Sequence, residues 1–191
     1  MPAALTPVSL RLTPEEYFDW EETQEEKHDY IHGEVFAVSG ATQEHNDIVI
    51  NLLVALRLAF RDTECAVFGS DMRVQVERNG RYTYPDLSAV CGEPAFLTAR
   101  ETTFTNPALV VEVLSDSTAS YDQGDKLAAY RGVRSIREIV LVHQLRRAVE
   151  VYRREGDARW SLEDVGPEGT LALASVGVEV SMDDLYAGTG L

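Results

Sequence analysis

The strongest constraint on the fold comes from ten residues near the middle of the chain, Asn106-Pro107-Ala108-Leu109-Val110-Val111-Glu112-Val113-Leu114-Ser115. A short apolar run bounded by turn residues is typical of a strand that is buried on both faces of a sheet. Glu112 interrupts this run with a carboxylate. Because burying an unpaired charge costs several kcal/mol, Glu112 must have a partner or bind a ligand.

A second acid stands in a similar apolar segment upstream. Asp86 belongs to Tyr84-Pro85-Asp86-Leu87-Ser88-Ala89-Val90, where Pro85 predicts a strand edge, a strand start or a bulge. A strand-end aspartate and a glutamate on the next strand can hold Mg²⁺, or Mn²⁺, with water completing the coordination. Lys126, on the helix expected after the Glu112 strand, could stabilise developing negative charge. These three residues form a candidate metal-dependent catalytic site.

Capping residues and periodicity predict the other elements. The sequence indicates a helix beginning at Thr13-Pro14, a hairpin turning at His32-Gly33, a long helix beginning at Thr42, strands at 65–68, 73–76, 81–90, 108–114 and 138–143, a helix at 121–131, and a β-rich tail from 148. The strand-helix-strand order between 108 and 143 predicts a crossover, and hence a parallel pair. We therefore expect a mixed α/β sheet flanked by helices, with a hairpin-rich C-terminal part.

Length and charge limit the possible functions. The 191 residues predict one domain, 1–191, and the formal net charge of −15 argues against broad nucleic-acid binding by phosphate neutralisation. That charge does not exclude an enzyme whose clustered acids bind cations. Cys65 and Cys91 fit no zinc or redox spacing, so we predict buried free thiols in a reducing cytosol. The sequence contains no stretch like a membrane span or a leader peptide, which predicts a cytoplasmic protein with no membrane partner.

Four groups of residues together resemble a known family. They are Asp29-Tyr30-Ile31-His32-Gly33-Glu34, Pro85-Asp86-Leu87-Ser88, Val111-Glu112-Val113-Leu114-Ser115, and the series Asp122, Lys126, Tyr130, Gly132, Val133. In this order they look like the Uma-two family of putative restriction endonucleases, in the PD-(D/E)XK nuclease superfamily. The resemblance covers about residues 12–145, which would be the core, and leaves about 146–191 as a β-rich C-terminal extension.

The resemblance implies a restriction-endonuclease-like core of helix, three-stranded antiparallel meander, helix and parallel strand. It also implies Mg²⁺-dependent hydrolysis of phosphodiester bonds in DNA, with Asp86 and Glu112 as metal ligands. The general pattern has a lysine two residues after the glutamate, where this chain has Leu114. Lys126 is then the migrated substitute for that lysine.

The resemblance leaves two further points open. Glu34, in the family-like hairpin, and Glu44, at the head of the long helix, are candidates for an additional metal-binding acid. A homodimer is compatible with the resemblance, because many nucleases of this type pair to cut two strands.

A catalytically silent protein with a binding or regulatory role is the alternative function. The net charge and the apolar residue at 114 favour it, whereas the intact acid pair with Lys126 favours the enzyme. Glu112 could instead be a structural partner of Lys126 or Arg131. His45 is interpreted as a helix-start residue, and Tyr130 as a core aromatic with a tethered hydroxyl. The basic residues could form a DNA-facing strip or a solvated hairpin; they are Arg131, Arg134, Arg137, Arg146, Arg147, Arg153 and Arg154.

Overall fold

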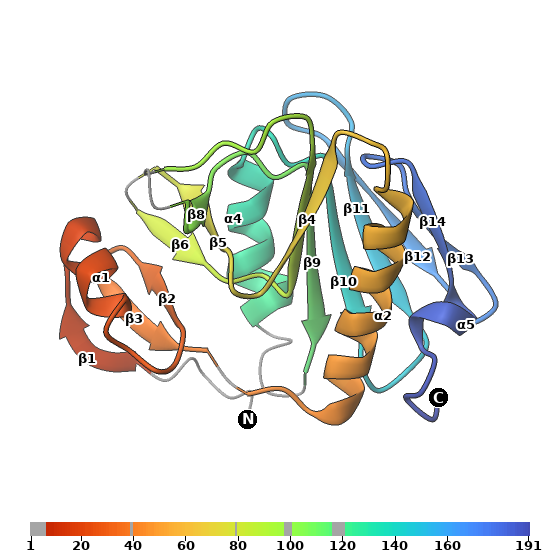
Figure 1. The fold of residues 1–191 in the computed structure, drawn as a ribbon, viewed down its shortest axis with the longest axis horizontal. Helices are drawn as coiled ribbons and strands as arrows, with labels where there is room; N and C mark the ends of the chain where they lie inside the picture. The colour runs from red at the N-terminus through yellow and green to blue at the C-terminus, as the bar shows by residue number, and fades with distance from the viewer. Residues whose placement is uncertain (1–6, 39, 79, 98–100, 116–120) are drawn as a thin grey trace.

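A six-stranded mixed sheet, the central sheet, runs through the molecule in the strand order β12-β11-β10-β9-β7-β4 (Figure 1). This fold comes from a computed structural model that describes residues 7–38, 40–78, 80–97, 101–115 and 121–191. β9 and β10 are parallel, and the other neighbouring pairs of this sheet are antiparallel. The predicted parallel pair and the mixed α/β class are therefore confirmed. The strands are β4 (Cys65–Gly69), β7 (Leu87–Cys91), β9 (Leu109–Leu114), β10 (Glu138–His143), β11 (Val149–Arg154) and β12 (Trp160–Val165).

The core elements follow the order that the family resemblance implied. Helix α2 (Gln43–Ala59) precedes β4, β7 and β9, which form a three-stranded antiparallel meander, and a helical segment then leads to β10. That segment begins as a π-helix, η1 (Asp122–Lys126), and continues as α4 (Leu127–Gly132). The predicted helix is therefore present, but its first turn is widened, as often occurs at functional sites.

The residues of β9 alternate between the two faces of the central sheet, as a strand buried on both sides requires. Val111 and Val113 belong to the cluster that includes α2 and the C-terminal elements, whereas Val110 and Leu114 pack with α4. Glu112 is two residues from both Val110 and Leu114, so its side chain lies on the same face of the sheet and points toward α4. The C-terminal elements are β13 (Thr170–Leu173), β14 (Val178–Ser181) and α5 (Met182–Leu185).

A second six-stranded sheet lies with α1 at the left of Figure 1 and has the order β1-β3-β2-β6-β5-β8. Our prediction of one strand over 81–90 is wrong, because these residues form β6 in the second sheet and β7 in the central sheet. The break falls at Pro85, which cannot donate a ladder hydrogen bond. The link Tyr84-Pro85-Asp86 thus passes between sheets and delivers Asp86 to the start of β7. The elements are β1 (Pro7–Arg11), α1 (Pro14–Glu21), β2 (His28–Ile31), β3 (Glu34–Ala37), β5 (Arg73–Glu77), β6 (Arg81–Thr83) and β8 (Thr103–Phe104).

Local signals determine where the first helices and the first hairpin form. Thr13 accepts the backbone N–H of Glu16, and the Glu16 carboxylate accepts the N–H of Thr13, which completes the predicted capping box of α1. The Thr42 hydroxyl caps α2 in the same way. The predicted hairpin turn is also present, with positive φ angles of 49° at His32 and 96° at Gly33.

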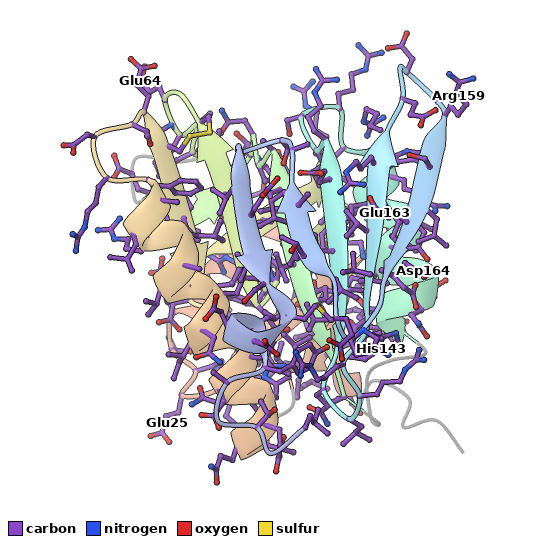
Figure 2. All side chains as sticks on the ribbon, turned by 90° about the vertical axis from the view of Figure 1, so that its right-hand side faces the viewer. Glu25, Glu64, His143, Arg159, Glu163 and Asp164 are labelled. Carbon is purple, nitrogen blue, oxygen red and sulfur yellow. A yellow bond between two sulfur atoms is a disulfide. The ribbon has the colours of Figure 1, made fainter. Side chains whose placement is uncertain are left out.

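The two cysteines of the chain are paired. Cys65 and Cys91 form a disulfide, visible as the yellow bond in Figure 2, so our prediction of buried free thiols is wrong. The antiparallel register of β4 and β7 places the two cysteines directly opposite each other, with Cα atoms 3.9 Å apart. A separation of 26 residues in the sequence gives no sign of this register.

Within the described ranges, no helix is both long enough and apolar enough to cross a bilayer.

We predict that Leu52→Ala lowers the free energy of unfolding by about 2–5 kcal/mol, because it leaves a cavity in the core. Leu52, on α2, is fully buried. The matched control is Leu162→Ala on β12, where the side chain is 52% exposed and the expected change is below about 0.5 kcal/mol. Urea unfolding of both variants measures the difference. Equal losses would contradict the position of α2 over the central sheet.

Candidate active site

One hydrogen bond holds the two predicted acids on neighbouring strands. Asp86 directly precedes β7, and its Oδ2 accepts a bond of 2.7 Å from the backbone N–H of Val113 on β9. Glu112 is the residue before Val113 in the same strand. The carboxylate of Asp86 is therefore fixed beside the strand that carries Glu112.

Glu112 is only 3% exposed, and its partners come from the helical segment that follows β9. Its Oε1 accepts a hydrogen bond of 2.6 Å from the Tyr130 hydroxyl and lies 2.8 Å from Nζ of Lys126. Lys126 and Tyr130 are four residues apart and so share one helix face. The structure thus brings together Asp86, Glu112 and Lys126, and it gives the Tyr130 hydroxyl a role in holding Glu112.

Burial and charge act in opposite directions on this pair. Burial raises the pKa of Glu112 well above its usual value, while the Lys126 ammonium works against that rise. Burial alone would lower the pKa of Lys126, but the attraction of the Glu112 carboxylate raises it well above its ordinary value. Because two donors converge on one oxygen of Glu112, we describe the pair as an ammonium and a carboxylate.

Both acids and Lys126 line one cavity of about 640 Å³. Asp122 also lines it, and the Asp122 Oδ1 lies 3.7 Å from Lys126 Nζ. Carboxylates outnumber ammonium groups among the described lining residues, so the cavity attracts cations more readily than anions. The acidic, basic and histidine side chains that line it are Glu25, Glu26, Lys27, His45, Asp86, Glu112, Asp122 and Lys126.

His45 reaches the site although the sequence analysis interpreted it only as a helix-start residue. It lies in the first turn of α2, and its Nε2 is 3.3 Å from Oδ2 of Asp86. Burial lowers the pKa of His45, but the hydrogen bond and the charge of Asp86 outweigh burial and raise it. The helical repeat carried a usable signal, because His45 lies three residues before Ile48 on the buried face of α2.

Gln144 is a second site residue that the sequence analysis missed. It directly follows β10, is 5% exposed, and lines the same cavity. Its Oε1 is buried and has no hydrogen-bond partner among the residues that the structure describes. Leaving a buried acceptor unpaired costs about 1–3 kcal/mol. This oxygen is therefore suited to accept a hydrogen bond from a bound molecule.

Asp29 explains why the second sheet matters to the site. It is buried, its Oδ1 accepts the N–H of Tyr84 at 3.0 Å, and its Oδ2 accepts the Tyr121 hydroxyl at 3.4 Å. Burial raises the pKa of Asp29, and the nearby charge of Lys126 opposes that rise. Arg81 adds a second tie, donating to the Tyr121 hydroxyl at 2.8 Å. The second sheet thereby positions both the segment that ends in Asp86 and the start of η1.

The structure does not bring Glu34 or Glu44 to the cavity. Glu34 lies on β3 at the surface and pairs with Arg11 at 2.8 Å. Glu44 stays at the start of α2, where its own backbone N–H and the Thr42 side chain lower its pKa. The neighbouring residue, His45, takes the inward position because a helix turns by about 100° per residue.

The predicted strip of arginines is divided into separate structural roles. Arg153 pairs with two carboxylates, Arg154 donates to three main-chain carbonyls between 131 and 136, and Arg147 pairs with a carboxylate of α5. Figure 2 shows Arg159 and His143 at opposite ends of the central sheet. Arg147 lies in the hairpin after His143, whereas Arg153 and Arg154 end β11 toward Arg159. The predicted strip is therefore split: Arg147 lies at one end of the central sheet, and Arg153 and Arg154 lie beside Arg131 and Arg137 at the other.

The donor atoms at the cavity fit a hydrated divalent cation. Among the described residues, no three His, Cys, Asp or Glu side chains form a ready-made metal cluster. Mg²⁺ needs fewer, because it usually keeps several waters and binds one or two carboxylates. Asp86 and Glu112 each use one oxygen for protein contacts, Oδ2 and Oε1 respectively. In the described part of the chain, Oδ1 of Asp86 and Oε2 of Glu112 have no hydrogen-bond partner.

Comparison with known proteins shows which family the chain resembles. The model of the Uma2 family, described as "Putative restriction endonuclease", matches residues 14–183. An uncharacterized protein of Synechocystis sp. (strain PCC 6803) is 34% identical over 179 residues, which is 93% of each chain. A second uncharacterized protein of the same organism is 36% identical over 154 residues, covering 81% of this chain and 87% of its own.

A solved structure has the same fold. The crystal structure of a putative nuclease belonging to DUF820, from Anabaena variabilis, superposes with a TM-score of 0.73 at 18% sequence identity. The match covers 92% of this chain and 97% of that chain. The restriction-endonuclease-like fold expected from the sequence is thereby confirmed.

We predict that Glu112→Gln and Lys126→Met each lower the free energy of unfolding by about 3–5 kcal/mol, because each leaves a buried charge without its partner. The double variant should lose less than the sum of the two. The control is Glu34→Gln, which removes an exposed ion pair worth about 0–1 kcal/mol. Urea unfolding of the four variants gives the coupling. Additive losses would show that Glu112 and Lys126 do not stabilise each other.

Proposed function

Because this chain belongs to the Uma2 family of putative restriction endonucleases, we propose that it is a nuclease that hydrolyses phosphodiester bonds in DNA with the help of Mg²⁺ or Mn²⁺. Family membership supports the reaction class, since the family description names a restriction endonuclease. The metal, the substrate and the residue roles below are inferred from the chemistry of the cavity.

The observation that carries the proposal is the pair of carboxylate oxygens left without protein partners, among the described residues, at one cavity. Oδ2 of Asp86 and Oε1 of Glu112 are held by donors from α2, β9 and the helical segment after β9. Such outer contacts orient metal ligands and are typical of metal sites. Asp86 and Glu112 would hold the ion through their other oxygens. A bound divalent ion supplies a Lewis acid for the phosphate and lowers the pKa of a bound water.

Lys126 and Gln144 would act on the reacting groups from two sides. Lys126 is buried as an ammonium group at the cavity, where a fixed positive charge stabilises the charge that develops on a phosphate during hydrolysis. Gln144 offers its unpaired Oε1 to the attacking water and would orient it. In the reaction, the water oxygen would bond to phosphorus as the bond from phosphorus to the leaving sugar oxygen breaks; the water would lose a proton to solvent, and the leaving oxygen would take up a proton from solvent to become a hydroxyl.

Because the chain is acidic, we expect its binding to DNA to depend on a divalent cation. The net charge of −15 repels a polyanion, and the cavity itself holds more carboxylates than lysines. A phosphate can approach Asp86 and Glu112 only after a cation has reduced that negative charge. DNA contact is therefore expected to depend on the divalent ion and not on a broad basic surface.

We predict that Asp86→Asn weakens Mg²⁺ or Mn²⁺ binding in calorimetry and abolishes metal-dependent nicking of supercoiled DNA. The loss should exceed the roughly 100-fold that removal of an outer partner of a metal ligand can cost, because Asp86 would hold the ion itself. Glu34→Gln is the matched control, since Glu34 is an acid outside the cavity, and it should leave both measurements unchanged.

The two readouts separate the alternatives. Metal binding that depends on Asp86, together with cleavage, supports the nuclease. Metal binding without cleavage of DNA or RNA would favour the catalytically silent protein. No binding at millimolar metal would overturn the proposal.

We predict that Gln144→Met slows cleavage about 10- to 100-fold and leaves metal affinity unchanged, because Gln144 would position the water and not the ion. Methionine has a similar length but cannot accept the same hydrogen bond. Single-turnover cleavage and calorimetry on the same variant distinguish the two effects. A parallel loss of metal affinity would instead make Gln144 part of the metal site.

A further inference from the structure

The outer face of α2 carries an apolar stripe that the candidate active site does not use. Ile50, Val54 and Leu58 are 46%, 50% and 51% exposed. They are spaced by four residues and therefore form one ridge along the helix. Figure 1 shows α2 at the front of the molecule, and the buried face of the helix packs on the central sheet through Ile48, Leu52 and Leu56. Such a regular exposed ridge is unusual on a helix that already has a buried face.

Two charged residues flank the α2 stripe (Ile50, Val54, Leu58) at equal distances from its centre. Asp47 lies seven residues before Val54, and Arg61 lies seven residues after it, in the turn that ends α2. Both share the outward side of the helix, since seven residues make nearly two turns. Among the described residues, neither takes part in an ion pair. The face is therefore acidic at one end, apolar in the middle and basic at the other end.

We propose that this face is the interface of a homodimer, in which α2 packs antiparallel against α2 of a second copy with Val54 on the two-fold axis. A two-fold axis through Val54 pairs each position with the one equally far on the other side. Ile50 of one copy then meets Leu58 of the other. Asp47 meets Arg61, and this pair forms twice.

A second copy of the chain fits this face better than an unrelated partner, because the pattern is complementary to itself. Reversing the helix direction places the acidic end on the basic end and the apolar middle on itself. A parallel arrangement would place Asp47 against Asp47 and Arg61 against Arg61, which costs energy. The small apolar area predicts a weak dimer, at the low end of specific interfaces.

The dimer would also fix the relative positions of two cavities. Thr42, His45 and Val49 line the cavity from the first turns of α2, whereas the stripe lies on the opposite side of the same helix. In an antiparallel pair the two cavities lie near opposite ends of the interface. The separation is set by the length of α2, about 26 Å for a 17-residue helix.

Sedimentation through the micromolar range tests the interface on the full chain. The wild-type chain should approach twice the monomer mass, and Val54→Asp should raise the dimer dissociation constant more than about tenfold, because it places two like charges on the axis. Leu162→Asp, on the equally exposed Leu162 of β12, should leave association unchanged. Far-UV circular dichroism and thermal unfolding establish that both variants are folded. A wild-type chain that stays monomeric, or a dimer that Val54→Asp does not weaken, overturns the proposal.

Charge reversal and cross-linking test the antiparallel geometry. Asp47→Arg and Arg61→Asp should each weaken association, and the double variant should restore it, because the pair is reversed in both copies. Val54→Cys should form an interchain disulfide on oxidation, and Leu162→Cys should not, since only a residue on the axis meets itself. Failure of the double variant to restore the dimer, or absence of the cross-link in Val54→Cys, would overturn this arrangement. None of these residues lines the cavity, so the outcome is independent of the proposed nuclease activity.

Discussion

The arrangement of the site depends on one buried carboxylate. Glu112 lies in a strand whose two faces are both covered, so its charge can be matched only by groups that the packing itself brings in. The helical segment after β9 supplies them, and both Lys126 and Tyr130 reach the same Glu112 oxygen. The helical segment must therefore lie where Lys126 and Tyr130 can reach Glu112. A chain that kept Glu112 but moved the helix would leave a buried charge unpaired.

The second sheet then acts as a frame for the site. β6 ends at Thr83, and the chain crosses through Tyr84-Pro85-Asp86 to β7 of the central sheet. Asp29 holds this crossing by the backbone of Tyr84, and it also binds Tyr121 at the start of η1. Two segments that are distant in the sequence are thereby fixed against one buried side chain. Asp29 is the first residue of the family-like motif Asp29-Tyr30-Ile31-His32-Gly33-Glu34, and these contacts give it a structural role.

Local patterns in the sequence were sufficient to predict elements and to nominate the three central residues. The caps at Thr13 and Thr42 and the apolar run before Glu112 are signals that neighbouring residues carry, and the structure contains each of them. The missed features depend on strand register or on the end of an element. The Cys65–Cys91 bond requires the pairing of β4 with β7, and the position of Gln144 at the cavity requires β10 to end beside β9, where the Gln144 N–H donates to the Leu114 carbonyl. Glu44 was nominated from the family resemblance, by its place at the head of the long helix, and its direction on that helix was not considered.

The acidity of the chain is compatible with the proposed chemistry, because acidic residues also predominate at the cavity. Asp86, Glu112 and Asp122 line one cavity together with Glu25 and Glu26, whereas the lysines among its described lining residues are Lys27 and Lys126, so carboxylates outnumber ammonium groups there. That excess makes phosphate binding unfavourable and cation binding favourable at the same place. A nuclease built in this way would contact its substrate only when a divalent ion is present. Net charge then says little about whether such a protein can act on DNA, because the local charge at Asp86 and Glu112 decides it.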